Sequence, residues 1–175
     1  FLSLCCFRGL CFLAMNIFIF ISVINVEFAT AMTLTFSSPF FIVILSIIFL
    51  QDKVGIYRWS AIIIGFIGVV LILRPTSEIF NFFSIFSILT AFAWGVTVMI
   101  LKFIPPNFST SKIQFYTLIF NVIGALTLFI ILSNDFTVNS MKDLMLMVLT
   151  GILGGTAAIL FVYAYRLISL SKLAS

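Results

Sequence analysis

The segment from Ala29 to Pro75 constrains the fold of this chain more than any other part of it. Two apolar runs, 29–50 and 57–73, are joined by a short polar turn at residues 51–56, and the first run is interrupted by the Ser-Ser-Pro sequence at 37–39. Proline removes a backbone hydrogen bond that hydrocarbon cannot replace, so such breaks persist where neighbouring helices or a water-filled cavity satisfy the backbone. We therefore predict a membrane hairpin that forms part of a pore or pocket.

The composition indicates that lipid is the solvent of this chain. Hydrophobic residues make up 63% of the 175 positions and charged residues 8%, with a mean hydropathy of +1.36, whereas a soluble domain carries about 25% charged residues. The nine basic residues stand singly instead of in clusters, so we expect no nucleic-acid partner.

The residue types needed for most catalytic and metal sites are scarce. Histidine is absent and the five acidic residues are scattered through turns, which removes His-ligated metals, His general bases and Ser-His or Cys-His pairs. The three cysteines lie in the first apolar run without a CxxC spacing, and we interpret them as small apolar residues. We therefore predict no enzymatic activity, no metal and no cofactor.

Six apolar runs approach the length of about 20 residues that a membrane-crossing helix needs. They cover residues 4–24, 28–50, 57–73, 80–104, 112–132 and 143–168. The connections are short, and no soluble domain is inserted between the runs. We predict an all-α membrane protein, a polytopic bundle of six transmembrane helices. Because the chain starts at Phe1 and stops at Ser175 within this pattern, we interpret it as a fragment.

The distribution of basic residues predicts how the bundle is oriented. Seven of the nine lie on one side of the predicted membrane, and Arg74 and Lys142 lie on the other. By the positive-inside rule, the turn at 51–56 is cytoplasmic. A shift of 142 residues aligns Gly9 with Gly151, which suggests that spans one and six are equivalents in an inverted repeat. Chance similarity between apolar helices is the alternative.

Polar side chains form one stripe on each of three predicted helices, at intervals of three or four residues. The stripes are Glu27, Thr30, Thr33 and Ser37; Ser84, Ser87, Thr90, Trp94 and Thr97; and Gln114, Thr117, Asn121 and Gly124. Such stripes can converge on a hydrated cavity. Alternatively, each hydroxyl bonds to its own helix or joins two helices, at about 0.6–2 kcal/mol per bond, and we favour this alternative for any single Ser or Thr.

We select candidate residues for two roles. The candidates for a substrate cavity are Asn16, Thr33, Ser37, Ser38, Pro39, Trp94, Asn121 and Tyr163. For Trp94, lining a cavity and simple packing are equally good interpretations. Ala61, Gly65 and Gly68 are predicted to pack closely against another helix, within the bundle or in a homodimer. No ionisable residue lies at mid-depth in a span, which favours an exchanger or a facilitator.

Short motifs along the chain resemble the drug/metabolite transporter superfamily, specifically its EamA-type members. These motifs are Arg8-Gly9-Leu10, Ala29-Thr30-Ala31, Ser38-Pro39-Phe40-Phe41, Leu50-Gln51-Asp52-Lys53, Arg58-Trp59, Gly65-Phe66-Ile67-Gly68-Val69-Val70, Arg74-Pro75, Ala93-Trp94-Gly95, Ala164-Tyr165-Arg166 and Ser169-Leu170-Ser171. Each motif is loose, but their order and spacing are fairly specific. The chain departs from the family at Gln51-Asp52, where family members usually have Gly-Glu.

The resemblance implies an inverted five-plus-five repeat of ten helices, of which this chain covers helices three to eight. Residues 1–75 would be the C-terminal part of the first repeat and 80–175 the N-terminal part of the second. It also implies a bacterial-type inner membrane and a central cavity reached by rocking of the repeats. The S-adenosylmethionine uptake branch is the most similar one, though only loosely.

Two hypotheses of different classes follow from these observations. The first is a secondary transporter that moves an amino acid or a nucleotide-like solute such as S-adenosylmethionine by alternating access. Its partners would be the solute and the lipid bilayer. The second is a non-transporting membrane protein, or a truncated and non-functional fragment of such a transporter. Extending the reading frame on both sides would discriminate the two.

Overall fold

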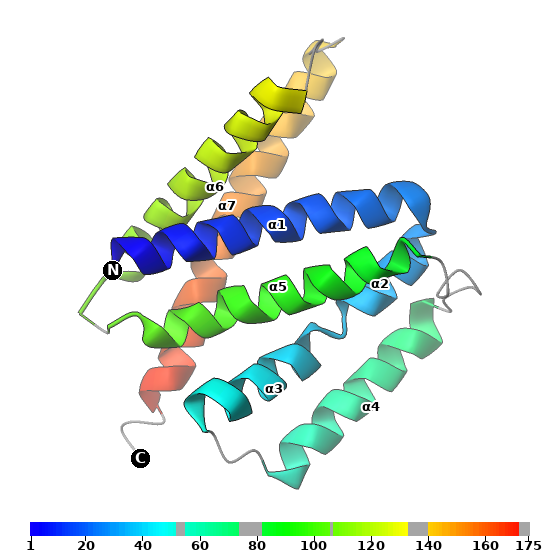
Figure 1. Ribbon diagram of the computed structural model, residues 1–175, viewed down its shortest axis with the longest axis vertical. Coiled ribbons are helices and arrows are strands. Elements are labelled where there is room, and N and C mark those ends of the chain that lie inside the picture. The colour runs from blue at the N-terminus through cyan, green and yellow to red at the C-terminus, as the bar shows by residue number, and fades with distance from the viewer. Residues whose placement is uncertain (52–54, 74–81, 106, 133–139, 172–175) are drawn as a thin grey trace. The chain divides into compact units, whose positions relative to one another are not determined.

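The computed structural model describes residues 1–51, 55–73, 82–105, 107–132 and 140–171. These residues form helices and no strand (Figure 1). The helices are α1 (Leu2–Asn25), α2 (Phe28–Thr35), α3 (Ser38–Leu50), α4 (Ile56–Leu73), α5 (Ser84–Phe103), α6 (Thr110–Leu132) and α7 (Met141–Ser171). Because α2 and α3 are two halves of one apolar run, the helices correspond to the six predicted spans.

The predicted fold class, an all-α polytopic membrane protein, is confirmed. Within the described residues, five helical stretches are long and apolar enough to cross a membrane, one of them being Phe28–Leu50 across the break, and Ile56–Leu71 is a shorter apolar helix. The burial pattern agrees with lipid as solvent, since large apolar side chains such as Ile24, Ile130 and Met141 are exposed while many Ser and Thr side chains are buried. A soluble domain places charged residues outside and apolar residues inside.

The chain divides into two compact units. One contains Phe7–Phe103 and the other contains Phe1–Cys6 together with Ile104–Ser175. Helix α5 therefore belongs to the same unit as α1 to α4. The predicted boundary between the two sequence repeats, at residues 75–80, differs from the boundary between these compact units. A repeat boundary describes internal duplication of the sequence, which packing does not test, so it stays a prediction.

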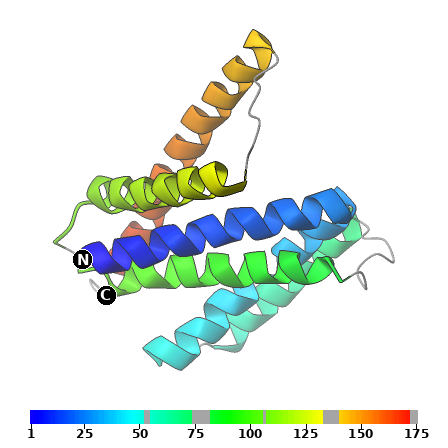
Figure 2. The ribbon, with the colours of Figure 1, turned by 45° about the horizontal axis from the view of Figure 1, so that its top comes forward.

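Helix directions alternate within the Phe7–Phe103 unit. Helix α5 has its most extensive contacts with α3 and then with α2, and it runs in the same direction as these two helices (Figure 1). Helix α1 lies beside α5 and runs in the opposite direction (Figure 2). This alternation is what short connections between successive membrane crossings require.

The second span is divided where the sequence predicts a break. Helix α2 ends at Thr35 and α3 begins at Ser38, with Pro39 in its first turn. The Ser37 backbone N–H and its hydroxyl both donate to the Leu34 carbonyl, at 3.1 and 2.6 Å. The Ser37 N–H and hydroxyl are thus satisfied locally, and proline sits at the helix start, where its missing N–H costs least.

Helix α3 ends in a left-handed residue. Gln51 has φ 53° and ψ 29°, and its N–H donates to the Ser46 carbonyl. A helix end of this kind is usually occupied by glycine, because a Cβ is unfavourable in that conformation. The Gln51 departure from the EamA-type pattern therefore falls at a position where glycine has a physical advantage. Asp52, Lys53 and Arg74 lie outside the described residues, so the cytoplasmic placement of the 51–56 turn stays a prediction.

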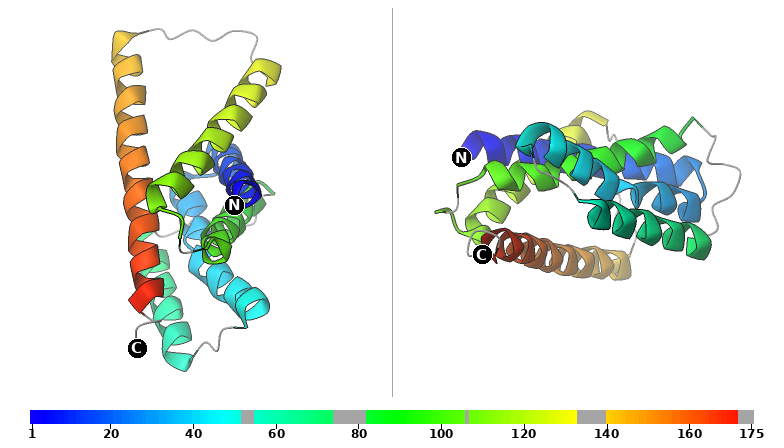
Figure 3. Two further views of the ribbon diagram at one scale, coloured as in Figure 1. Left: turned by 90° about the vertical axis from the view of Figure 1, so that its left-hand side faces the viewer. Right: turned by 90° about the horizontal axis from the view of Figure 1, so that it is seen from below.

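The second unit is built around α6 and α7. These two helices are in contact and run in opposite directions, approaching each other near the start of α6 and diverging toward its end (Figure 3). Serine residues precede both helices. Ser109 Oγ accepts from the Lys112 N–H at 3.4 Å, and Ser140 Oγ accepts from the Lys142 N–H at 3.2 Å. Such N-caps satisfy donors that the first helical turn leaves free.

Candidate functional site

A polar seam joins α1 and α5 at two levels. Near one end of the pair, Arg8 Nε donates to the Thr97 carbonyl at 3.2 Å. Near the other end, the hydroxyl groups of Ser22 and Ser87 share a hydrogen bond of 2.7 Å. The two levels are 14 residues apart along α1, which is about 21 Å of helix. The seam therefore fixes the antiparallel register of the two helices over most of their length.

Arg8 is the charged side chain of this seam. Only 4% of it is exposed, although it lies in the second turn of an apolar helix. A buried charge is costly unless hydrogen bonds compensate it, and in a membrane it usually faces the bundle interior. The sequence assigned Arg8 to membrane orientation and to the motif Arg8-Gly9-Leu10, and to no contact between helices. Its interhelical role was missed because its bonding partner is 89 positions away.

Most hydroxyl groups of the predicted polar stripes bond to their own helices. Thr33 donates to the Ala29 carbonyl, Thr90 to Phe86 and Thr97 to Ala93, all at 2.8–2.9 Å. Thr117 of α6 donates to Ile113 at 2.8 Å. These side chains thus follow the alternative in which Ser and Thr satisfy themselves locally, whereas Ser22 and Ser87 join two helices.

The candidate residues of the second span have separate environments. Thr33 is buried and faces the interior of its unit, while Ser37 and Ser38 are half-buried at the break. Pro39 is exposed and lines a groove with Ala61 and Gly65 of α4. The structure therefore brings a predicted cavity residue together with two residues predicted to pack helices.

Asn16 and Trp94 belong to the facing helices α1 and α5. The Asn16 amide donates to the Phe12 carbonyl of its own helix at 2.8 Å. The Phe12 ring in turn contacts Trp94, with ring centroids 6.4 Å apart at 45°. The two candidates are thus linked through Phe12, and both are half-buried.

The remaining two cavity candidates lie in the other unit. Asn121 of α6 is half-buried, and within the described residues its Nδ2 is buried without a hydrogen-bond partner. A buried donor left unpaired costs about 1–3 kcal/mol, so it is suited to a ligand or a water. Tyr163 of α7 is 54% exposed. The role of both residues in a cavity stays a prediction.

Close helix packing occurs at a different glycine from those predicted. A Cβ added at Gly95 would lie 3.2 Å from Phe41 Cβ and 3.4 Å from the Ile42 nitrogen, so α5 and α3 approach closely there. A Cβ added at Gly65 or Gly68 would meet no atom within 4 Å among the described residues. The predicted packing at Ala61, Gly65 and Gly68 therefore stays a prediction. The Ala93-Trp94-Gly95 motif contained Gly95, but its sequence does not say which helix it faces.

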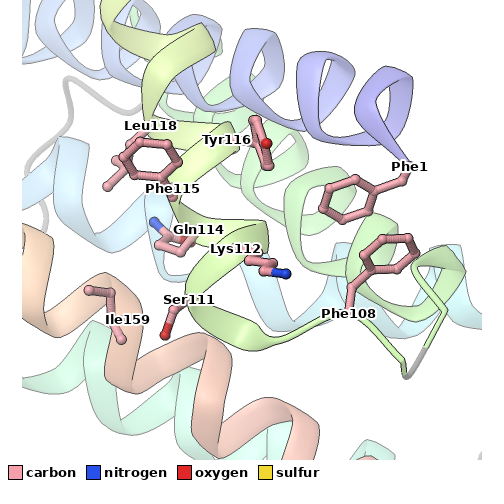
Figure 4. Close-up of a pocket in the computed structure, with 9 residues that line it drawn as sticks. All are labelled: Phe1, Phe108, Ser111, Lys112, Gln114, Phe115, Tyr116, Leu118 and Ile159. Carbon is pink, nitrogen blue, oxygen red and sulfur yellow. The ribbon is translucent and has the colours of Figure 1, made fainter.

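An aromatic pocket of about 640 Å³ surrounds the first turns of α6 in the second unit (Figure 4). The Phe1 and Phe108 rings stack with centroids 3.9 Å apart, and Tyr116 meets Phe1 edge-on at 5.7 Å. Lys112 and the buried Gln114 supply polar atoms to the same pocket. Pockets of this size, largely apolar with a few polar groups, suit small organic molecules. Sequence reasoning did not single it out.

Comparison with known proteins gives a family and several relatives. The EamA-like transporter family matches residues 1–74. The chain is 31% identical over 137 residues to a riboflavin transporter of Rhizobium johnstonii, covering 77% of this chain and 44% of the relative. It is 36% identical over 97 residues to a riboflavin transporter of Vibrio cholerae, covering 53% and 33%.

A third relative is named for a different substrate. The chain is 27% identical over 139 residues to an S-adenosylmethionine uptake transporter of Rickettsia bellii, covering 79% of this chain and 47% of the relative. The chain therefore spans less than half the length of these relatives. No solved structure matches the chain significantly.

Proposed function

We propose that this chain is a member of the EamA-like transporter family, whose model matches residues 1–74, and that the full-length protein is a secondary transporter that moves a small organic metabolite by alternating access. The family match and the named relatives support the EamA-type character that the sequence motifs predict. We further propose that the protein resides in a bacterial inner membrane with the 51–56 turn in the cytoplasm.

The divided second span is the observation that carries this proposal. Helices α2 and α3 meet at Ser37 in the middle of an apolar run, beside α5. Secondary transporters form their substrate sites near the membrane midplane from discontinuous helices of this kind. A rearrangement at the break would change the contact of α3 with α5 while α2 stays in place. We therefore propose Thr33, Ser37, Ser38 and Pro39 as neighbours of the transport path.

A nucleotide-like solute with a flat ring system is the substrate class that we propose. The names of the relatives support it, because riboflavin and S-adenosylmethionine both contain fused planar rings. The aromatic pocket beside α6 supports it independently, since Phe108 and Tyr116 offer ring surfaces. Stacking of a base on an aromatic side chain is worth about 1–3 kcal/mol. Asn16, Trp94, Asn121 and Tyr163 are proposed as further contacts along the path.

Solute uptake by the full-length protein in proteoliposomes tests the proposal. Labelled riboflavin, S-adenosylmethionine and a set of amino acids would be offered, each with and without unlabelled solute inside the vesicles. We expect saturable uptake of at least one ring-containing solute, accelerated by internal solute. Absence of flux for every solute in protein that is folded and inserted would refute the transporter proposal and favour a non-transporting protein.

The substrate class is tested by a pair of tyrosine variants. Tyr116→Ala removes a ring from the aromatic pocket, whereas Tyr57→Ala removes a ring that is 88% exposed on α4. We expect Tyr116→Ala to raise the apparent KM for the ring-containing solute about fivefold or more, from the stacking energy, and Tyr57→Ala to leave it unchanged. If the two variants have the same KM for the ring-containing solute, the aromatic pocket does not bind that solute.

A further inference from the structure

A groove lies between the two arms of the α2–α4 hairpin, and of the residues proposed beside the transport path it is lined by Pro39 alone. Its volume is about 530 Å³, and one stripe of side chains from each arm lines it. Phe36, Pro39 and Val43 come from the first arm, at intervals of three and four residues. On α4 the lining extends from Arg58 to Val69, which is about 16 Å of helix. The groove is thus long and parallel to the helices.

The residues along the groove explain why it is open. Gly65 in its α4 wall has no side chain, and a Cβ added there would meet no atom within 4 Å. Helix α4 also packs more extensively on α2 than on α3. The Phe40 ring spans the two helices beside the groove, edge-on to Phe66 with centroids 5.4 Å apart. The groove therefore results from how the two arms of the hairpin pack, and it lies on the apolar surface of the hairpin.

Arg58 is the charged residue among the groove's lining residues, and it lies at one end. Its side chain is exposed, and its backbone N–H bonds to the Gly55 carbonyl in the first turn of α4. The guanidinium charge and the partial positive charge of the helix start therefore add at this end. The remaining lining residues are apolar.

We propose that this groove binds one anionic phospholipid. Arg58 holds the phosphate group at one end of the groove. From there an acyl chain lies along the apolar lining, past Pro39 and toward Val69. An apolar groove open to the bilayer fills with acyl chains, and a basic residue at its headgroup end selects anionic lipids. The positive-inside distribution predicts that this end is cytoplasmic, where juxtamembrane basic residues meet anionic headgroups. A transmembrane helix in the groove would leave the Arg58 charge without an anion.

Lipid binding to the purified full-length protein tests the proposal. Phosphatidylglycerol and phosphatidylcholine with identical acyl chains would be titrated into delipidated protein and bound lipid counted by native mass spectrometry. We expect phosphatidylglycerol to bind more tightly, and Arg58→Gln to weaken its binding about fivefold, from the roughly 1 kcal/mol that one basic residue contributes near the membrane surface. Inorganic phosphate alone is expected not to displace the lipid.

Two further variants make the test specific. Lys102→Gln removes an exposed basic residue that does not line the groove and is expected to leave phosphatidylglycerol binding unchanged. Gly65→Leu fills the groove, where an added Cβ meets no atom within 4 Å, and is expected to weaken binding of both lipids. Equal effects of Arg58→Gln and Lys102→Gln would overturn the proposal. Equal affinity for the two lipids would also overturn it. Disulfide crosslinking of two copies of a Gly65→Cys variant would show that a second copy occupies the groove, and this result would overturn it too.

Discussion

The close approach of α5 and α3 at Gly95 leads to a quantitative prediction for Gly95→Ala. The new Cβ would lie 3.2 Å from Phe41 Cβ, 3.3 Å from Leu45 Cδ1 and 3.4 Å from the Ile42 nitrogen. The Leu45 methyl group can rotate away. Phe41 Cβ and the Ile42 nitrogen are fixed to the backbone of α3, so the two helices must separate by a few tenths of an ångström.

The expected cost follows from two opposing contributions. Adding a methyl group to a well-packed contact costs about 1–3 kcal/mol. Replacing glycine by alanine within a helix gains about 1 kcal/mol. We therefore expect Gly95→Ala to range from neutral to about 2 kcal/mol destabilising. Gly65→Ala is the matched control, because its Cβ meets no atom within 4 Å, and it should be stabilising by up to about 1 kcal/mol.

Thermal unfolding of the full-length protein in a single detergent measures this difference. For a full-length protein of about 300 residues, the length of the relatives, 1 kcal/mol corresponds to about 1.5 °C in Tm. We expect the Tm of Gly95→Ala to fall at least about 1.5 °C below that of Gly65→Ala. Equal Tm values would refute the close contact between α5 and α3. A lower Tm for Gly65→Ala would instead support the sequence-based prediction that Gly65 packs against another helix.

Three further predictions concern the helix break, the seam and the end of α3. Pro39→Leu restores helix continuity, and we expect slower transport at unchanged membrane insertion; unchanged transport rates in proteoliposomes would show that the break is incidental. Ser22→Ala and Ser87→Ala should show a coupling energy of about 0.6–1.7 kcal/mol in a double-mutant cycle of unfolding free energies, and additive effects would contradict their 2.7 Å bond. Gln51→Gly should be stabilising by up to about 1 kcal/mol because the position has φ 53°, and a lower Tm would count against the left-handed helix end.

Helix positions were predictable because the signals that set them are local. The six predicted runs agree with the described helices to within a few residues, and the break before Pro39 follows from its missing N–H. The turn residues and the length of each apolar run act over short stretches of chain. Local signals also predicted that most Ser and Thr hydroxyl groups bond to their own helices.

The candidate site was less predictable because, in a lipid bilayer, hydrophobicity does not indicate which face of each helix is turned toward the other helices. In water, an apolar stripe marks the buried face of a helix, but in a bilayer the outer face is apolar as well. The sequence therefore could not distinguish Gly95, which contacts α3, from Gly65, whose added Cβ would meet nothing within 4 Å. It also could not show that Pro39 lines a groove with Gly65.

The sequence by itself determined the solvent, the approximate limits of the apolar helices and the position of the break, because each of these depends on the chemistry of neighbouring residues. Only the tertiary structure decided which polar groups meet. Arg8 and Thr97 are 89 positions apart and Ser22 and Ser87 are 65 apart. Such pairs depend on how helices are rotated and in which register they pack. In lipid those choices rest on close contacts and hydrogen bonds between helices, which no single segment of the sequence contains.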